Sequence, residues 1–357
     1  MKAFILFILS VTSLYAIEAK QPKQFVDLRG TWKFEIGDNR KYAEPNFDDK
    51  KWSDIFVPAN WENEGFPGYD GYAWYRKTFT LPANIKGKRL VLNMGFVDDV
   101  CAVYVNGILI GEGGRFEPDY QTGYDREQNF LIPDDALQFG KENVIAVRVY
   151  DAMQGGGIVR GRIGITEEQS DIKFVMQFPL RWKFHTGDDI KWKEMSFDDR
   201  SWSDLIVPAK WDFQGFRDYD GYGWYRLTFD VPANADRNNL VMLLGKIDDV
   251  DETFLNGVRI GKTGRVRSDG SISSSEDYQK LRGYDIPTSL LKEKGNVLAV
   301  RVYDGLKDGG IYEGPVGIIT EKEFDHMDRA NNRWYYNRWN ANDGNPIDLF
   351  FEKLFGK

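Results

Sequence analysis

The chain has 357 residues, a net charge of −8 and one cysteine. The acidic balance argues against nucleic acid and anionic membranes as partners, because these ligands require a cationic surface. A single cysteine excludes an intramolecular disulfide, so stability has to come from buried apolar cores. Aromatic residues make up 15% of the chain, which is compatible with stacking surfaces for sugars or partners in addition to core packing.

The first residues predict a secretory signal peptide. A charged start at residues 1–2 precedes an apolar run at 3–11, and small residues follow near Ala16 and Ala19. The run is too short to span a bilayer, and no cysteine follows it that could accept a lipid. We therefore expect residues 1–19 to be a signal peptide and the mature protein to be secreted or periplasmic, without membrane insertion.

An internal repeat organises the rest of the chain. The pattern that starts at Trp32 recurs from Trp182 with a constant offset of 150 residues (182 − 32 = 150). The shared strings are Tyr-Asp-Gly-Tyr at 69–72 and 219–222, Trp-Tyr-Arg at 74–76 and 224–226, Asp-Asp at 98–99 and 248–249, and Asn-Gly at 106–107 and 256–257. A repeat of this length predicts two domains, 20–168 and 169–320, each with its own core. The boundary lacks a Pro/Gly-rich linker, so we expect the domains to pack against each other.

Short strand-like runs with turns between them predict an all-β fold. Residues 88–94 are apolar, and the run 100–105 ends in an Asn-Gly turn before 108–110, which is a strong hairpin signal. Residues 144–150 and 297–303 are rich in β-branched side chains and are expected to be central strands. Because no helices alternate with the strands, the pattern favours two tandem jelly-roll β-sandwiches.

The two copies differ mainly in the loop that follows Gly114 and Gly264. The string Gly-Tyr-Asp is reached at 123–125 in the first copy and at 283–285 in the second, where a polar insertion at 268–275 lengthens the loop. We align these two strings with each other. Loops that change length on a fixed scaffold are where binding specificity tends to vary.

Past Thr320 the pattern becomes helical. Residues 321–339 are compatible with a helix, and 345–355 have the N-cap asparagine, first-turn proline and following glycine of a short helix. We expect 321–357 to be a helical tail, in which an apolar stripe of Phe350, Phe351, Leu354 and Phe355 packs across the two domains. A protein partner for this stripe is the alternative.

Aromatic, acidic and cationic side chains are densest at residues 69–76. Sugar recognition uses an aromatic ring for the CH face of a pyranose and a carboxylate or guanidinium for neighbouring hydroxyls. For Trp74 and Arg76, and for their copies Trp224 and Arg226, the alternative is a core tryptophan with a buried arginine neutralised by an aspartate. Both interpretations are open from sequence.

The pairs Asp98-Asp99 and Asp248-Asp249 are not expected to be catalytic. Adjacent residues on a strand or turn point apart, whereas glycoside hydrolysis uses two carboxyls that face each other about 5 to 9 Å apart. A turn, a hydrogen bond to a neighbouring loop or a cation ligand is the better interpretation. The chain has no Asp-x-Asp-x-Asp loop, so no cofactor is predicted, and a structural calcium ion is left open.

Other catalytic systems lack the residues they need. His185 and His326 are the only histidines, and neither is duplicated, so a Ser-His-Asp or Cys-His arrangement has little to build on. Glycines at 155–157 and 309–310 follow strands without a following helix. They predict tight turns beside a ligand or a neighbouring loop, and argue against a dinucleotide site.

Several of these strings resemble the sugar-binding jelly-roll domain of glycoside hydrolase family 2. They are Trp-Tyr-Arg-Lys-Thr-Phe-Thr-Leu-Pro at 74–82, Asp-Asp at 98–99, Tyr-Val-Asn-Gly at 104–107, Ala-Val-Arg-Val-Tyr-Asp at 146–151 and Gly-Gly-Ile at 156–158. The jelly roll inserted in bacterial sialate O-acetylesterases is also similar, through Ile-Asp-Asp at 247–249 and Ala-Val-Arg-Val-Tyr-Asp at 299–304. The resemblance covers roughly residues 25–320 and implies a galactose-binding-like β-sandwich in each half.

The resemblance does not imply catalysis. Members of these families hydrolyse their substrates with a separate barrel or serine-hydrolase domain, for which we expect no room in this chain. In family 2 the strand after the Gly-Ile element can supply an acid to the sugar site of the barrel. Here Val-Arg-Gly at 159–161 and Tyr-Glu-Gly at 312–314 follow that element, so the same contact is not expected.

The sequence therefore predicts an exported, non-catalytic carbohydrate-binding protein, accessory to polysaccharide or glycoconjugate degradation. Loop side chains would bind the sugar by aromatic stacking and by hydrogen bonds from Asp and Arg. The candidate binding residues are Trp61, Tyr69, Asp70, Arg115, Tyr124, Asp125, Trp211, Tyr219, Asp220, Arg265, Tyr284 and Asp285. Two linked sites would gain affinity by avidity. The alternatives are a glycoside hydrolase with an unrecognised carboxylate arrangement and a protein-docking scaffold.

Overall fold

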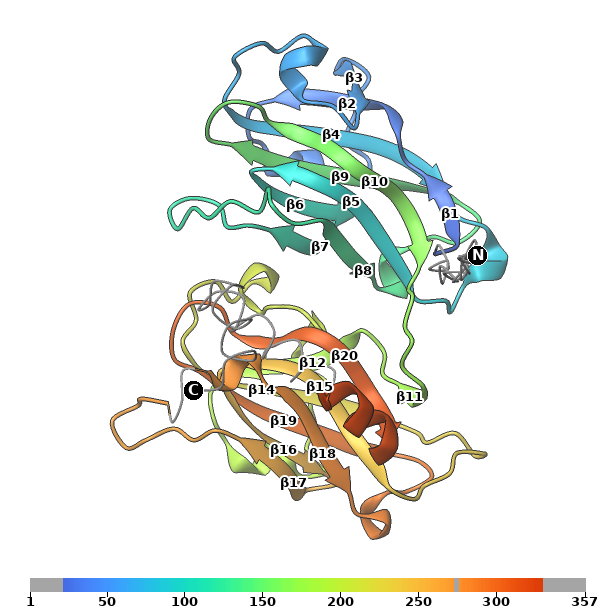
Figure 1. The fold of residues 1–357 in the computed structure, drawn as a ribbon, viewed down its shortest axis with the longest axis vertical. Coiled ribbons are helices and arrows are strands. Elements are labelled where there is room, and N and C mark those ends of the chain that lie inside the picture. Colours follow the sequence, from blue (N-terminus) through green and yellow to red (C-terminus); the bar gives the residue numbers. More distant parts are fainter. Residues whose placement is uncertain (1–21, 273–275, 330–357) are drawn as a thin grey trace, which may run out of the picture.

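The computed structural model describes residues 22–272 and 276–329. These residues form two β-sandwiches that lie one above the other along the long axis of the molecule (Figure 1). The predicted all-β fold of two tandem sandwiches is confirmed. The predicted signal peptide at 1–19 and the predicted helix at 345–355 lie outside the described residues.

The first sandwich consists of a four-stranded and a six-stranded sheet, and every strand pair is antiparallel. The four-stranded sheet has the order β1 (Gln24–Asp27), β10 (Gly157–Glu167), β5 (Leu90–Asp98), β8 (Gln128–Ile132). The six-stranded sheet has the order β3 (Ser53–Val57), β2 (Gly30–Ile36), β4 (Gly71–Thr80), β9 (Glu142–Asp151), β6 (Val100–Val105), β7 (Ile108–Gly113). Its loops contain the 3-10 helices η1 (Arg40–Ala43), η2 (Trp61–Glu64), η3 (Ala83–Ile85) and η4 (Asp134–Ala136).

The second sandwich repeats this strand order. Its four-stranded sheet runs β11 (Phe174–Gln177), β20 (Gly310–Thr320), β15 (Leu240–Asp248), β18 (Leu281–Ile286). Its six-stranded sheet runs β13 (Ser203–Ile206), β12 (Arg181–Thr186), β14 (Gly221–Phe229), β19 (Asn296–Asp304), β16 (Val250–Leu255), β17 (Val258–Thr263). The 3-10 helices here are η5 (Ile190–Lys193), η6 (Asp212–Gln214), η7 (Asp277–Gln279) and η8 (Thr288–Leu290).

The predicted hairpins and central strands are confirmed. Asn106 and Gly107, between β6 and β7, both have positive φ, 50° and 83°, as a two-residue hairpin turn requires. The second copy forms the same turn, with φ of 53° at Asn256 and 83° at Gly257. Strands β9 and β19 each lie inside a six-stranded sheet.

Each sandwich buries its own core between its two sheets. Trp32, Phe34 and Tyr75 are fully buried in the first core. Trp74 is buried in a second cluster of the same domain, next to Arg76, which is 2% exposed and forms a 2.8 Å ion pair with Asp49. Since the second copy repeats this arrangement with a 2.8 Å pair between Arg226 and Asp199, the core interpretation of these tryptophans and arginines is confirmed.

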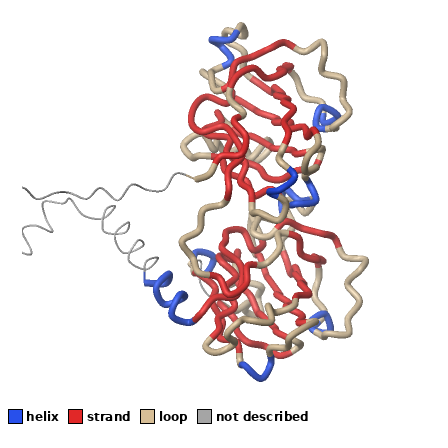
Figure 2. The backbone as a smooth tube through the Cα atoms, turned by 90° about the vertical axis from the view of Figure 1, so that its right-hand side faces the viewer, coloured by secondary structure: helices blue, strands red, loops and turns tan. Residues whose placement is uncertain are grey.

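The two sandwiches are in contact, although Figure 2 shows their strands as separate groups joined by a loop. Arg181 forms a 3.0 Å ion pair with Asp135, and the Arg89 guanidinium donates to the carbonyl oxygen of Phe178 at 3.0 Å. These polar contacts cross from the strands and loops of one sandwich to those of the other.

The chain continues from β20 into a helix at 321–329, up to the end of the described residues. Phe324 and Met327 of this helix pack against Val241 and Ile319 on the outer face of the second sandwich. This part of the predicted tail therefore covers its own domain. Among the described residues, no helix is long and apolar enough to cross a membrane.

Candidate functional site

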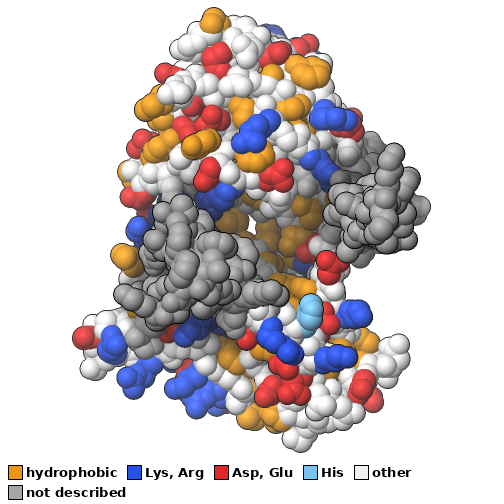
Figure 3. Space-filling model, viewed as in Figure 1, with side chains coloured by type: hydrophobic (Ala, Val, Ile, Leu, Met, Phe, Trp, Pro, Cys, Tyr) orange, Lys and Arg blue, Asp and Glu red, His pale blue; other side chains and the backbone are white. Residues whose placement is uncertain are grey.

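A groove of about 700 Å³ lies between the two sandwiches. Its lining comes from the β7–β8 loop of the first sandwich and from the loops before β14 and after β19 of the second: Arg115, Glu117, Pro118, Asp119, Tyr120, Gln121, Asp218, Asp220, Lys307 and Asp308. The space-filling view shows the surface hollowed between the upper and the lower lobe (Figure 3). Both copies of the repeat are therefore needed to form this site.

The first wall of the groove is a short closed loop. The backbones of Arg115 and Gln121 exchange two hydrogen bonds, of 2.8 and 3.0 Å. The residues between them therefore form a compact loop. Phe116 anchors this loop, since it is buried beside Tyr72 with the Arg148 guanidinium 4.2 Å from its ring centre. Tyr120, beside the closing Gln121, is 37% exposed; its ring makes a T-shaped contact with Tyr150 at 5.8 Å between centres, and the exposed part of the ring can face a ligand.

The second wall is acidic and is tied to the first by Arg115. The Arg115 guanidinium contacts Asp308 directly and lies 3.8 Å from Asp212. Lys210 binds the other oxygen of Asp308 at 2.6 Å. Burial would raise the pKa of Asp308, but the hydrogen bonds from Arg115 and Lys210 lower it overall. Asp308 thus stays ionised as the link between the sandwiches.

Only two of the predicted binding residues, Arg115 and Asp220, meet in this groove. Asp70, Tyr124, Asp125 and Asp285 are exposed but do not line it. Arg265 lies elsewhere on the second sandwich, in a smaller hollow of about 140 Å³ that includes Tyr222, Arg301 and Tyr303.

The two predicted stacking tryptophans are core residues, so their assignment to sugar binding is wrong. Trp61 and Trp211 are both 0% exposed. They lie under the glycine-rich turns after β9 and β19, where a Cβ on Gly156 or Gly309 would overlap the indole ring. The glycines therefore serve a neighbouring loop, which is one of the two roles predicted for them.

Tyr69 and Tyr219 also have structural partners. The hydroxyl of Tyr69 donates to the carbonyl oxygen of Tyr72 at 2.7 Å and accepts the backbone N–H of Gly37 at 3.3 Å. Tyr219 makes the matching bonds, at 2.8 Å to Tyr222 and 3.1 Å from Gly187. Since both hydroxyls are occupied and both rings are half-buried, these residues close their own loops.

The alignment of Tyr124 with Tyr284 is wrong. Tyr284 lies in β18 opposite Met242, whereas the residue in the corresponding position of β8, opposite Leu92, is Phe130. Tyr284 is 9% exposed, so it cannot stack on a sugar. The repeated string Gly-Tyr-Asp falls in a loop of the first copy and in a strand of the second, and the loop insertion is shorter than the string suggested.

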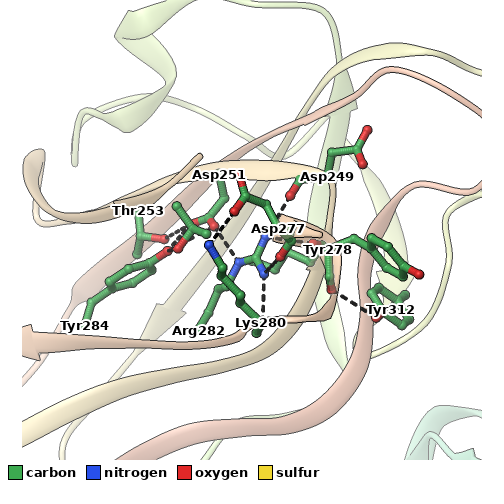
Figure 4. Close-up of polar contacts among 11 residues, drawn as sticks. Asp249, Asp251, Thr253, Asp277, Tyr278, Lys280, Arg282, Tyr284 and Tyr312 are labelled. Atoms are coloured by element: carbon green, nitrogen blue, oxygen red, sulfur yellow. Dashed lines mark hydrogen bonds and ion pairs between the residues drawn. The ribbon is translucent and has the colours of Figure 1, made fainter. Parts of the chain in front are cut away.

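Tyr284 belongs to a buried polar network (Figure 4). Its hydroxyl lies 2.9 and 3.0 Å from the two carboxyl oxygens of Asp251, which also accepts from Thr253 at 3.0 Å. Arg282 pairs with Asp251 at 3.0 Å and donates to the carbonyl oxygens of Ile247 and Asp249, each at 2.8 Å. This network anchors the turn that carries Asp248 and Asp249.

Three aspartates meet at one end of each sandwich. Asp98, Asp99 and Asp151 each offer a carboxyl oxygen within 4.8 Å of the others, and Asp248, Asp249 and Asp304 do the same in the second copy. The expectation that adjacent aspartates point apart is wrong for both pairs. Each pair occupies the connection between two strands, β5 and β6 in the first copy and β15 and β16 in the second, and its peptide bond is cis.

The carboxyls of these clusters differ in their pKa. Burial, with the neighbouring Asp99, raises the pKa of Asp98 to about 7, and burial raises that of Asp151 to about 7. Burial acts on Asp99 as well, but hydrogen bonds from Thr122, Tyr120 and the Ala152 backbone lower its pKa overall. In the second cluster, burial raises the pKa of Asp248 to about 8 and that of Asp304 to about 7.

Sequence reasoning missed Tyr120, Asp218, Lys307 and Asp308. A faint signal was present, because Tyr120 follows a Pro-Asp turn in the loop whose length differs between copies, and Asp308 precedes the Gly-Gly pair after β19. Nothing in the local sequence indicates that loops about two hundred residues apart, such as those of Arg115 and Asp308, face each other.

Comparison with known proteins confirms the resemblance to a domain of glycoside hydrolase family 2 enzymes. Residues 37–155, within the first sandwich, match the family described as "Beta-galactosidase second all-beta domain". Residues 37–155 are thus similar to an all-β domain of β-galactosidases, and the second sandwich repeats the strand order of the first.

Two curated relatives are glycosidases. A β-galactosidase of Bacteroides ovatus is 31% identical over 147 residues, 37% of this chain and 16% of the relative. A β-glucuronidase of Formosa agariphila is 34% identical over 132 residues, 33% of this chain and 12% of the relative. The chain therefore matches less than a fifth of the length of either protein. The solved β-glucuronidase of Bacteroides uniformis is 20% identical, with a TM-score of 0.36 over 80% of this chain and 28% of that one.

Proposed function

We propose that the protein binds carbohydrate in the groove between its sandwiches, as a non-catalytic accessory to the breakdown of polysaccharides or glycoconjugates. The observation that carries the proposal is the convergence of Tyr120 with carboxylates from both sandwiches, Asp119 and Asp220, in one groove. The glycosidase relatives support a carbohydrate ligand.

The groove offers the two chemistries that sugar binding uses. The exposed ring of Tyr120 can stack on the CH face of a pyranose. The carboxylates of Asp119 and Asp220 and the ammonium of Lys307 can bond to the hydroxyls around it. A groove of this size accepts a short oligosaccharide segment.

Export is part of the proposal, because a binder of extracellular polysaccharide has to reach its ligand. The charged start and the short apolar run at residues 1–11 support it. Edman sequencing of the mature protein should begin near residue 17 or 20.

The test uses the full chain on a glycan array, followed by calorimetry with any glycan that is retained. Tyr120→Ala should weaken binding about tenfold, because stacking on one aromatic ring is worth about 1 kcal/mol or more. Tyr124→Ala is the matched control, since Tyr124 is 52% exposed in the same loop but outside the groove. Equal losses in both variants, or no glycan retained by the wild type, would contradict the proposal.

A glycoside hydrolase is the second candidate, and one observation favours it. The pKa of Asp98 is raised to about 7 while that of its neighbour Asp99 is lowered, as in pairs where one carboxyl acts as acid and the other as nucleophile. Their oxygens lie within 4.8 Å, closer than the separations of about 5 Å or more that hold a glycosidic bond. Turnover of aryl glycosides that disappears in Asp98→Asn would establish this activity and overturn the non-catalytic function.

A further inference from the structure

Four acidic positions recur in both sandwiches at the same places in the fold. Three are the aspartates at the ends of β5 and β9, and of β15 and β19. The fourth is Glu62 in η2, matched by Asp212 in η6. Glu62 accepts the backbone N–H of Gly156 at 3.2 Å, and Asp212 accepts that of Gly309 at 2.9 Å. Both copies thus keep these four acidic positions, although the neighbouring core residues differ between the copies.

A buried oxygen without a partner lies in each cluster. Asp151 is 0% exposed; its Oδ1 accepts the backbone N–H of Met153 at 3.2 Å, while its Oδ2 has no hydrogen-bond partner. Asp304 repeats this, with Oδ1 bound by Leu306 at 3.1 Å and Oδ2 unpartnered. Leaving a carboxylate oxygen buried and unpaired is costly. Each oxygen therefore calls for a cation or a proton.

No basic side chain supplies that cation within the described residues. Lys and Arg form no ion pair there with Asp98, Asp99 or Asp151, nor with their three copies. Other buried acids of the second sandwich are paired, as Asp251 is with Arg282 and Asp277 is with Lys280. The two aspartate clusters therefore differ from the general rule that a buried charge is paired with an opposite charge.

The spacing of the oxygens fits a calcium ion. Calcium binds oxygens at about 2.3 to 2.6 Å, so ligands on opposite sides of the ion lie up to about 5 Å apart. The three carboxyl oxygens lie within 4.8 Å of one another. The three carboxylates offer one oxygen each, and calcium also accepts carbonyl oxygens and water as ligands. Magnesium keeps several of its water ligands when a protein binds it. Because Asp99 and Asp151 are buried, the cluster suits calcium better than magnesium.

The backbone around the first cluster is already fixed. Asp99 donates its N–H to Tyr150 at 3.0 Å and accepts the Gly123 N–H at 2.7 Å. Its carboxylate is held by Thr122 at 2.6 Å and by the Ala152 N–H at 3.1 Å. These bonds orient the carboxylate without a charged partner, which is how ligands are positioned before an ion binds.

We propose that each sandwich binds one calcium ion, through Asp98, Asp99 and Asp151 in the first and through Asp248, Asp249 and Asp304 in the second. The ions neutralise the clustered carboxylates and join the turn after β5 to the end of β9, and the turn after β15 to the end of β19. This inference does not depend on carbohydrate binding.

The test is calorimetric titration of calcium chloride into the full-length, EDTA-stripped protein. The wild type should bind two ions per chain, Asp151→Asn and Asp304→Asn one each, and the double variant none. Asparagine keeps the oxygen that accepts the Met153 or Leu306 N–H, so the turn is retained. Asp125→Asn is the control, because Asp125 is an exposed acid in the first sandwich; it should still bind two ions.

Thermal melting separates loss of binding from loss of folding. In EDTA, Asp151→Asn should melt at the wild-type temperature or above, because it removes repulsion; in 5 mM calcium it should gain less than the wild type. The inference is overturned if the wild type binds no calcium at millimolar concentration, or if the double variant still binds two ions. Magnesium binding as tight as calcium binding would overturn the choice of ion.

Discussion

Some buried charged side chains of this protein have a partner of opposite charge, and others among the described residues have none. Arg76 is almost fully buried, yet its guanidinium bonds to Asp49 at 2.8 Å and to the carbonyl oxygens of Tyr42 and Glu44. The complete set of partners explains how a charged side chain is tolerated beneath a loop. Asp98 and Asp151 have no such cation among the described residues, and their pKa values of about 7 reflect that difference.

The raised pKa values predict a stability that falls as the pH rises. The four groups Asp98, Asp151, Asp248 and Asp304 have pKa values of about 7 to 8, above the ordinary 3.8. The folded state therefore binds more protons than the unfolded state between about pH 4 and 8, and the stabilisation is lost as the pH passes the folded pKa. In EDTA, the melting temperature should fall between pH 5.5 and pH 8.5.

A double variant isolates these groups from the other titrating side chains. Asp151→Asn with Asp304→Asn should show a shallower decline over the same pH range, measured by circular dichroism. A wild-type melting temperature that rises with pH, or equal slopes in the two proteins, would contradict the assignment.

At the scale of the elements, equivalent strand positions carry charged and polar side chains in the second copy and mostly apolar side chains in the first. Asp251 and Thr253 in β16 stand where β6 has Cys101 and Val103. Arg282 and Tyr284 in β18 stand where β8 has Gln128 and Phe130. The second core thus contains a complete ion-pair network where the first contains mostly apolar packing. Such a network is stable only while every member has its partner.

Breaking this network in one place should cost more than removing its central pair. Arg282→Gln leaves Asp251 buried without its cation and should lower the free energy of unfolding of the second sandwich by about 3 to 5 kcal/mol. Adding Asp251→Cys, which restores the residue types of the first copy, should recover most of that loss. Urea unfolding in reducing buffer measures both variants.

The control for this prediction is Arg259→Gln, because Arg259 is 53% exposed and pairs with Glu252 at 3.1 Å. An exposed pair of this kind is worth about 1 kcal/mol or less. If the double variant is less stable than Arg282→Gln alone, the buried pair is not the source of the loss.

At the scale of the whole molecule, the sequence was sufficient for the fold but not for the site. The 150-residue offset and the Asn-Gly turns depend on local and periodic signals, and these determine strands and hairpins. A loop tryptophan such as Trp61 has the same sequence signature whether it faces a sugar or a glycine turn. The groove depends on how the two sandwiches sit together, which no short motif records, so only Arg115 and Asp220 of the predicted residues belong to it.

The last prediction concerns that arrangement. Arg115 is the groove residue that bridges the sandwiches, through Asp308 and, at 3.8 Å, Asp212. Its side chain is 18% exposed and that of Asp308 is 22% exposed, so the pair is partly desolvated and stronger than a surface ion pair. Arg115→Gln leaves Asp308 with Lys210 alone. The variant should show a broader distance distribution in small-angle X-ray scattering while each sandwich remains folded.

Arg126→Gln is the control, because Arg126 lies in the same loop, is exposed, and pairs only with Asp125 at 3.6 Å among the described residues; its scattering should match the wild type. If Arg115→Gln also scatters like the wild type, the sandwiches are held by their other contacts, such as those of Arg89, Arg181 and Arg217, and not by Arg115. Because groove binding needs both walls at a fixed spacing, the Arg115 variant that loosens the sandwiches should also lose glycan affinity, and Arg126→Gln should keep it.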